Sequence, residues 1–124
     1  MHRDGIENPN VPRLVTYIDG KPHARLMFVN GLSYRNVNGV ATPIPFLYNP
    51  NRADNLAFSF QMQMALNASH PSLNRRIYLN AFRFSTHFLP KSLLLEVGDQ
   101  RSTRQEAKNA MYPFAQALAY ILRD

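Results

Sequence analysis

The sequence predicts an α/β fold, a mixed β-sheet flanked by helices, in a single domain spanning residues 1–124. Two short runs, 23–29 and 92–97, are apolar on both faces, which is typical of central strands. Two longer segments, 53–67 and 103–123, have the composition or the spacing of helices, so strands and helices alternate along the chain. The length of 124 residues and the 45% hydrophobic content suit one globular domain.

The first half of the chain predicts a β-hairpin followed by a long loop. Residues 13–18 (RLVTYI) and 23–29 (HARLMFV) have the pattern of strands, joined by a turn at 19–22 in which Gly20 can supply a positive φ. Residues 30–50 contain three prolines and several Gly and Asn residues. They predict a long irregular loop, a kind of connection that is usually functional or mobile.

Residues 53–67 (ADNLAFSFQMQMALN) fit two patterns. Large apolar side chains occupy alternate positions from Leu56 to Leu66, as in a strand. The Ala, Leu, Gln and Met content favours a helix, because these residues are good helix formers and none is β-branched. We predict a helix whose start is capped by Asn51 or Asp54 and whose methionines fill the core.

The second half predicts two further strands. A turn at 70–76 (HPSLNRR) leads to a short strand within 77–84 (IYLNAFRF). The run 92–97 (SLLLEV) follows as a strand that is apolar on both faces, which again indicates a central position.

A capping box marks the start of the last helix. Thr103 and Glu106 have the spacing at which each side chain can accept the free backbone N–H of the other residue. Apolar residues then recur at helical spacing, which predicts a helix over 103–123. Pro113 lies inside this helix and is expected to kink it.

The composition restricts the classes of function. The chain has no cysteine, so disulfides and thiolate metal sites are excluded, and any metal would have His, Asp or Glu ligands. The net charge of +6 favours acidic partners such as nucleic acid, anionic membrane or anionic cell-wall polymer. The basic residues are scattered, so no specific nucleic-acid motif is present. No apolar stretch is long enough to span a bilayer, and the polar first ten residues predict no signal peptide.

Glu96 is the residue that most suggests chemistry. It follows three leucines at the predicted end of a buried strand, and functional groups gather at strand ends in α/β sheets. Simple exposure to water is the other interpretation, because Glu is usually exposed. The four histidines form no HxH or HxxxH pair, so their spacing predicts no metal site. They are His2, His23, His70 and His87.

An ordered series of motifs covers nearly the whole chain: HRD, YIDGKPHARLMFVNG, NPNRADNLAFSF, HPSLNRRIYL, LPKSLLLEVGDQRSTRQEA and AQALAYIL. In this order they resemble the stage II sporulation protein P family, whose members are zinc-dependent N-acetylmuramoyl-L-alanine amidases that cut peptidoglycan. The resemblance implies a zinc amidase-like fold and an extracytoplasmic location at the cell wall. It also implies a sporulation transglycosylase as a partner.

The resemblance assigns roles to three residues. The histidine of the family's IHRD motif is a zinc ligand and matches His2. The glutamate of its LLIEVG motif is the catalytic acid and base and matches Glu96. The arginine of its GLSRGI turn lies beside the cleft and matches Arg75, for which substrate binding and a surface salt bridge both stay open. We therefore expect His2 and Glu96 to lie close together on neighbouring strands.

The implied zinc site is incomplete. The family's ligands are His, Glu and His, and the first two lie upstream of HRD, together with the first strands of the sheet. We therefore expect the chain to be a domain fragment, a truncated reading frame or a degenerate paralogue. Substitute ligands are conceivable, although no family motif contains them. They are His23, His70, His87 and Glu7.

Two other functions stay open. A non-catalytic cell-wall-binding module could use the same fold, although pure binding does not need a carboxylate at Glu96. A basic nucleic-acid-binding domain would bind random DNA in a salt-dependent way. The sequence does not predict the oligomeric state, an endopeptidase side activity or the role of the loop 30–50.

Overall fold

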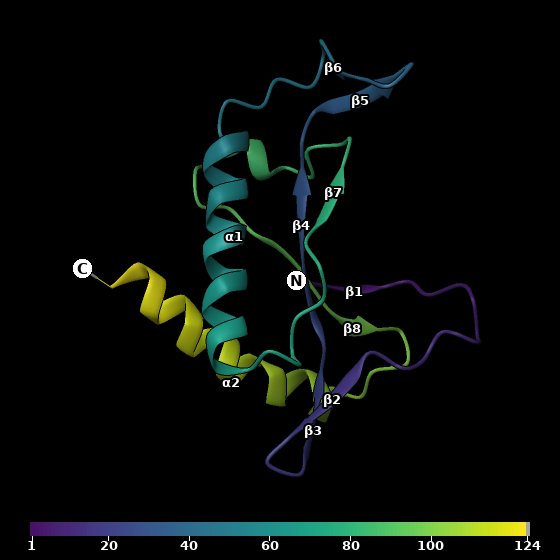
Figure 1. Cartoon of the computed structure of the whole chain (residues 1–124), viewed down its shortest axis with the longest axis vertical. Helices are drawn as coiled ribbons and strands as arrows, with labels where there is room; N and C mark the ends of the chain where they lie inside the picture. The colour runs from purple at the N-terminus through teal and green to yellow at the C-terminus, as the bar shows by residue number, and fades with distance from the viewer. Residues whose placement is uncertain (124) are drawn as a thin grey trace.

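The computed structural model describes residues 1–123 and confirms the predicted α/β class (Figure 1). A mixed four-stranded sheet has the order β1-β8-β4-β7 and is accompanied by two hairpins and two long helices. The strands are β1 (His2–Asp4), β2 (Val15–Ile18), β3 (Lys21–Ala24), β4 (Leu26–Gly31), β5 (Tyr34–Val37), β6 (Val40–Pro43), β7 (Tyr78–Asn80) and β8 (Leu94–Asp99). The helices are α1 (Arg52–Ser69), α2 (Arg104–Leu122) and the short 3₁₀ helix η1 (Thr86–Phe88). Within residues 1–123, neither long helix has the hydropathy needed to cross a membrane.

The two strands that were predicted to be central are central. β4 and β8 pair antiparallel in the middle of the sheet, while β1 lies parallel to β8 and β7 lies parallel to β4. Alternate residues of β4 and β8 enter one hydrophobic core with both long helices, which lie to the left of the sheet in Figure 1. These strand residues are Leu26, Phe28, Leu95 and Val97. The opposite face of the sheet therefore carries the intervening side chains.

The predicted first hairpin is present as β2 and β3. Its two strands pair antiparallel across Asp19 and Gly20, whose φ angles of 51° and 74° suit a tight two-residue turn. The predicted strand 23–29 is divided at Arg25, however, because its first part pairs with β2 and its second part enters the main sheet. One apolar run thus contributes strands to two different sheets. The periodicity of the sequence does not reveal this division.

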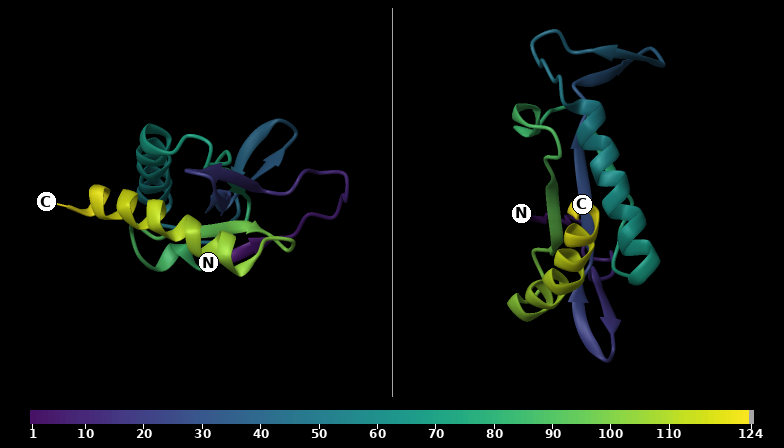
Figure 2. Two further views of the ribbon diagram at one scale, coloured as in Figure 1. Left: turned by 90° about the horizontal axis from the view of Figure 1, so that it is seen from below. Right: turned by 90° about the vertical axis from the view of Figure 1, so that its left-hand side faces the viewer.

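The prediction of an irregular loop over 30–50 is wrong in the middle of that range. β5 and β6 form a second hairpin around Asn38 and Gly39, whose φ angles are 52° and 83°. The Gly39 N–H donates to Asn36 Oδ1 at 2.7 Å. Asn-Gly is a strong hairpin signal, which the neighbouring prolines obscured. The hairpin projects away from the main sheet (Figures 1 and 2).

The predicted helix over 53–67 is α1. Its buried face contains Phe58, Met62 and Leu66, which recur every four residues and pack into the core. The composition of the segment therefore decided its structure, and the strand-like alternation did not. Burying a side chain such as Leu66 stabilises the fold by about 1.5–3 kcal/mol.

The predicted side-chain cap of α1 is not formed. Asn51 occupies the N-cap position without a capping bond, and Asp54 lies within the first turn. The Asn51 amide instead donates to the His87 carbonyl at 2.8 Å, and the Asn55 amide donates to the Thr86 carbonyl at 2.6 Å. The first turn of α1 therefore anchors η1.

The short strand predicted within 77–84 is β7, and the rest of that range is not a strand. The strand ends at Asn80, and the φ angles of 51° at Phe84 and 61° at Ser85 turn the chain before η1. The segment passes so close to β4 that a Cβ atom at Gly31 would collide with the carbonyl oxygen of Phe82. Glycine is therefore required at position 31.

The predicted capping box of α2 is formed. The Glu106 N–H donates to Thr103 Oγ1 at 3.1 Å, and the Thr103 N–H donates to Glu106 Oε2 at 2.9 Å. Arg13 donates to both carboxylate oxygens of Glu106 at 2.7 Å. The helix runs through Pro113 to Leu122, and the kink expected at this proline stays a prediction.

Candidate catalytic site

Glu96 lies on the face of the sheet opposite the helices. Its neighbours Leu95 and Val97 are 2% and 5% exposed and belong to the helix-facing core. Because side chains alternate along a strand, Glu96 points to the other face. The prediction that Glu96 ends its strand is wrong, since β8 continues to Asp99. Pairing continues through an irregularity at Gly98, whose φ of 63° is characteristic of a glycine bulge.

His2 lies beside Glu96, as predicted. The two residues are register partners on the parallel strands β1 and β8. On the other side of Glu96, its antiparallel partner on β4 is Met27. Directly opposed residues of neighbouring strands project to the same face of a sheet. His2, Glu96 and Met27 therefore form one row across three strands.

One oxygen of the Glu96 carboxyl makes no hydrogen bond within the described part of the chain, although charged side chains lie nearby. Its Oε2 atom is buried and has no hydrogen-bond partner among residues 1–123. Burial raises the pKa of Glu96, and the nearby Asp4 carboxylate adds to this effect, while the neighbouring His2 and Arg75 oppose it. A carboxylate with a raised pKa is better suited to taking and returning a proton near neutral pH.

Arg75 lies at this site and makes an ion pair. Its Nη1 atom donates to Asp4 Oδ2 at 2.8 Å, and both side chains are partly buried. Its backbone is also held, because its N–H donates to the Leu26 carbonyl at 2.7 Å and its carbonyl accepts from Gln63 Nε2 at 2.9 Å. The sequence analysis missed Asp4. Strand alternation could have indicated it, because Asp4 follows His2 by two residues.

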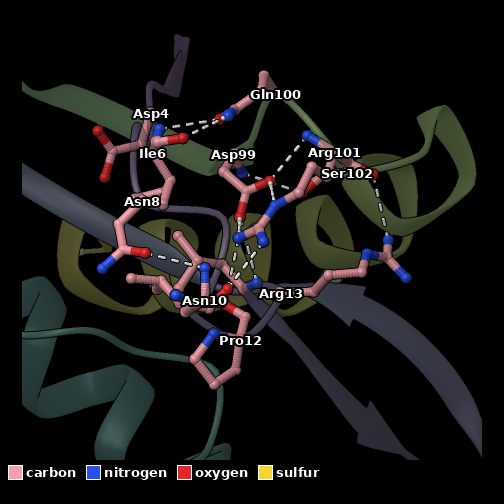
Figure 3. Close-up of polar contacts among 12 residues, drawn as sticks. Asp4, Ile6, Asn8, Asn10, Pro12, Arg13, Asp99, Gln100, Arg101 and Ser102 are labelled. Carbon is pink, nitrogen blue, oxygen red and sulfur yellow. Dashed lines mark hydrogen bonds and ion pairs between the residues drawn. The ribbon is translucent and has the colours of Figure 1, made fainter.

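The chain after β8 holds β1 and its following loop in place (Figure 3). The Gln100 side chain accepts the Ile6 N–H at 2.9 Å and donates to the Ile6 carbonyl at 2.7 Å. The Gln100 N–H also donates to the Asp4 carbonyl at 3.2 Å. These three bonds join the end of β1 to the end of β8 and so help to keep His2 opposite Glu96.

A buried ion pair anchors the same loop (Figure 3). Asp99 is fully buried and accepts from the Nη2 atom of Arg101 at 2.7 Å and from its Nε atom at 3.1 Å. Arg101 also donates to the carbonyls of Val11 at 2.8 Å and Pro12 at 3.2 Å. The hydrogen bonds from Arg101 lower the pKa of Asp99 to about 2 in spite of its burial. The charged pair therefore connects the loop before β2 to the end of β8.

The residues that the structure describes do not complete a metal site. Residues 1–123 contain no group of three or more His, Cys, Asp or Glu side chains placed to hold one ion. A catalytic zinc ion needs three protein ligands, so His2 and its neighbours do not fit a complete zinc site by themselves. The substitutes considered from the sequence do not assemble with His2 into such a group. They were His23, His70, His87 and Glu7.

Comparison with known families identifies the chain. The family model described as stage II sporulation protein P matches residues 1–119. The chain belongs to this family. No curated protein and no solved structure matches it. The region matched to stage II sporulation protein P contains the whole candidate site: His2, Asp4, Arg75 and Glu96.

Proposed function

We propose that this chain carries the acid–base part of an N-acetylmuramoyl-L-alanine amidase, an enzyme that hydrolyses peptidoglycan. The observation that carries the proposal is the buried, unpartnered carboxylate oxygen of Glu96 beside His2, on the face of the sheet opposite the helices. The family resemblance supports the amide between the muramic acid lactyl group and L-alanine as the bond that is cut. It also supports a location outside the cytoplasm, at the cell wall, and a sporulation transglycosylase as a partner.

Glu96 is the group that moves protons in this proposal. Its carboxylate takes a proton from a water molecule while the water oxygen bonds to the amide carbonyl carbon. The carbon–nitrogen bond then breaks, and Glu96 passes the proton to the leaving L-alanine nitrogen. The products are a lactyl carboxylic acid on the glycan and a free amine on the peptide. Arg75 is paired with Asp4, and both charges act on the Glu96 carboxylate.

We propose His2 as one ligand of a zinc ion. Its position beside Glu96 and its match to the family's HRD histidine support this role. The other ligands would come from protein outside residues 1–123, because those residues supply no group of three. When bound, zinc supplies Lewis acidity toward the amide carbonyl.

The test uses the complete gene product and purified peptidoglycan. Released peptides are measured by liquid chromatography with mass spectrometry, and bound zinc is measured by elemental analysis. Glu96→Gln should lower the rate by at least about 10²-fold, since acid–base catalysis typically contributes about 10²–10⁴-fold. The same variant should keep its zinc, because Glu96 is not a proposed ligand. His2→Ala should lose zinc and activity together.

Glu7→Gln is the matched control. Glu7 is exposed in the loop after β1, and the substitution makes the same chemical change, so its activity should equal that of the wild type. A zinc-loaded Glu96→Gln protein with nearly full activity would refute the amidase proposal. Binding to cell walls without hydrolysis by the wild type would instead identify a non-catalytic wall-binding module.

A further inference from the structure

A cavity of about 530 Å³ opens beside the candidate catalytic site. Its lining residues, which we call the arginine cleft, are Arg25, Met27, Arg75, Arg76, Ile77 and Tyr78. Met27 is the register partner of Glu96, so the cleft begins one strand away from the proposed catalytic carboxylate. The volume is in the range of cavities that hold small ligands, about 300–1,000 Å³.

Two of the three arginines are held in place by the fold. Arg25 donates through Nε to the Ser72 carbonyl at 3.1 Å and through Nη2 to the Asn74 carbonyl at 2.6 Å. Arg75 is held by its ion pair with Asp4. These bonds fix the positions of two cations before any ligand binds, which lowers the entropy cost of binding.

The positive charge of the arginine cleft is only partly compensated. Arg75 is paired with Asp4, but Arg25 and Arg76 take part in no ion pair among residues 1–123. Between Gly20 and Leu95 the chain contains a single acidic residue, Asp54. It lies on α1, which packs against the other face of the sheet. The cleft is therefore a concave surface suited to an anionic group.

We propose that the arginine cleft binds a free carboxylate of the peptide part of peptidoglycan and so directs the scissile amide toward Glu96. This inference rests on the function proposed above. Guanidinium groups bind carboxylates through paired, charge-assisted hydrogen bonds. Peptide stems carry free carboxylates, whereas the N-acetylated sugars of the glycan do not. The cleft therefore binds the part of the substrate on the peptide side of the scissile amide. The half-exposed ring of Tyr78 lines the cleft and can contact an apolar part of the peptide.

The test compares two synthetic muramyl tripeptides by isothermal titration calorimetry with the chain of residues 1–124. One has free carboxylates, and in the other every carboxylate is converted to an amide. The wild type should bind the carboxylate form about tenfold more tightly than the amide form, because a single charge-assisted contact contributes about that much affinity. Arg76→Gln should bring the ratio of the two affinities close to one. Because Arg76 is exposed, this substitution should leave the fold intact.

Arg35→Gln is the control variant, because Arg35 is exposed on the β5–β6 hairpin, outside the cleft. It should keep the wild-type affinity ratio. Equal affinity of the wild type for both peptides, or an unchanged ratio in Arg76→Gln, would overturn the cleft assignment and leave the amidase proposal standing. Failure of both peptides to bind to this chain would also overturn the cleft assignment, while the amidase proposal is decided separately by the Glu96→Gln assay on purified peptidoglycan. If Glu96→Gln were fully active and still preferred the carboxylate peptide, the amidase mechanism would be refuted. The cleft would then remain a peptide-binding site.

Discussion

Asp99→Asn removes the charge of a buried carboxylate while keeping the size of the side chain. Asp99 accepts the Arg101 backbone N–H at 2.7 Å and two guanidinium bonds from the same residue. It also accepts the Leu14 N–H at 3.4 Å. We expect the variant to be less stable and to hold the loop after β1 less firmly, because Asp99 and Arg101 connect that loop to β8.

The size of the effect follows from the pKa of Asp99. A tenfold change in proton affinity is worth about 1.4 kcal/mol. Hydrogen bonds from Arg101 lower the Asp99 pKa from 3.8 to about 2, which corresponds to about 2 kcal/mol of stability at neutral pH. This contribution is fully present above pH 3.8 and is lost as the pH falls toward 2. The difference in unfolding free energy between wild type and Asp99→Asn should therefore be largest near neutrality and should shrink below pH 3.8.

Urea unfolding followed by circular dichroism measures this difference. With a slope of about 1–3 kcal/mol per molar urea, the loss should lower the midpoint by about 1 M at pH 7. Asp19→Asn is the control, since Asp19 is exposed in the β2–β3 turn, where its φ of 51° is also accessible to Asn. An Asp99→Asn midpoint equal to that of the wild type, or a gap that does not narrow in acid, would show that the ion pair does not stabilise the fold.

Two further predictions concern the ends of secondary-structure elements. Thr103→Ala removes one half of the α2 capping box and should cost about 1 kcal/mol in urea unfolding, so an unchanged midpoint would argue that the box is not formed in solution. Gly31→Ala places a Cβ atom against the Phe82 carbonyl and should cost about 1–3 kcal/mol or more. Gly5→Ala is its control, because a Cβ there meets nothing within 4 Å, and equal melting temperatures for the two variants would contradict the close approach.

Local sequence signals predicted the elements whose structure depends on neighbouring residues. The capping box of Thr103 and Glu106 predicted the start of α2, because both partners of the bonds lie within one turn. Apolar character on both faces predicted that β4 and β8 are central, because only a covered strand tolerates it. The missed hairpin of β5 and β6 had a local signal as well, in Asn38 and Gly39.

The candidate site could be predicted only in part. The residues by themselves singled out Glu96, and the family resemblance added His2 and Arg75 and the expectation that His2 lies beside Glu96. A salt bridge of Arg75 was left open, but neither approach identified Asp4 as its partner, because Asp4 and Arg75 are far apart in the chain and no local spacing links them.

The tertiary structure alone decided what surrounds Glu96. The bulge at Gly98 extends β8 beyond the predicted end, so Glu96 lies within the strand and between His2 and Met27. The division of one apolar run at Arg25 places that arginine at the edge of the cleft, close to Arg75 and Arg76 in space. Such contacts depend on strand register and on loop closure between distant segments. A local pattern of residues carries no information about either, because register is set by the pairing partner.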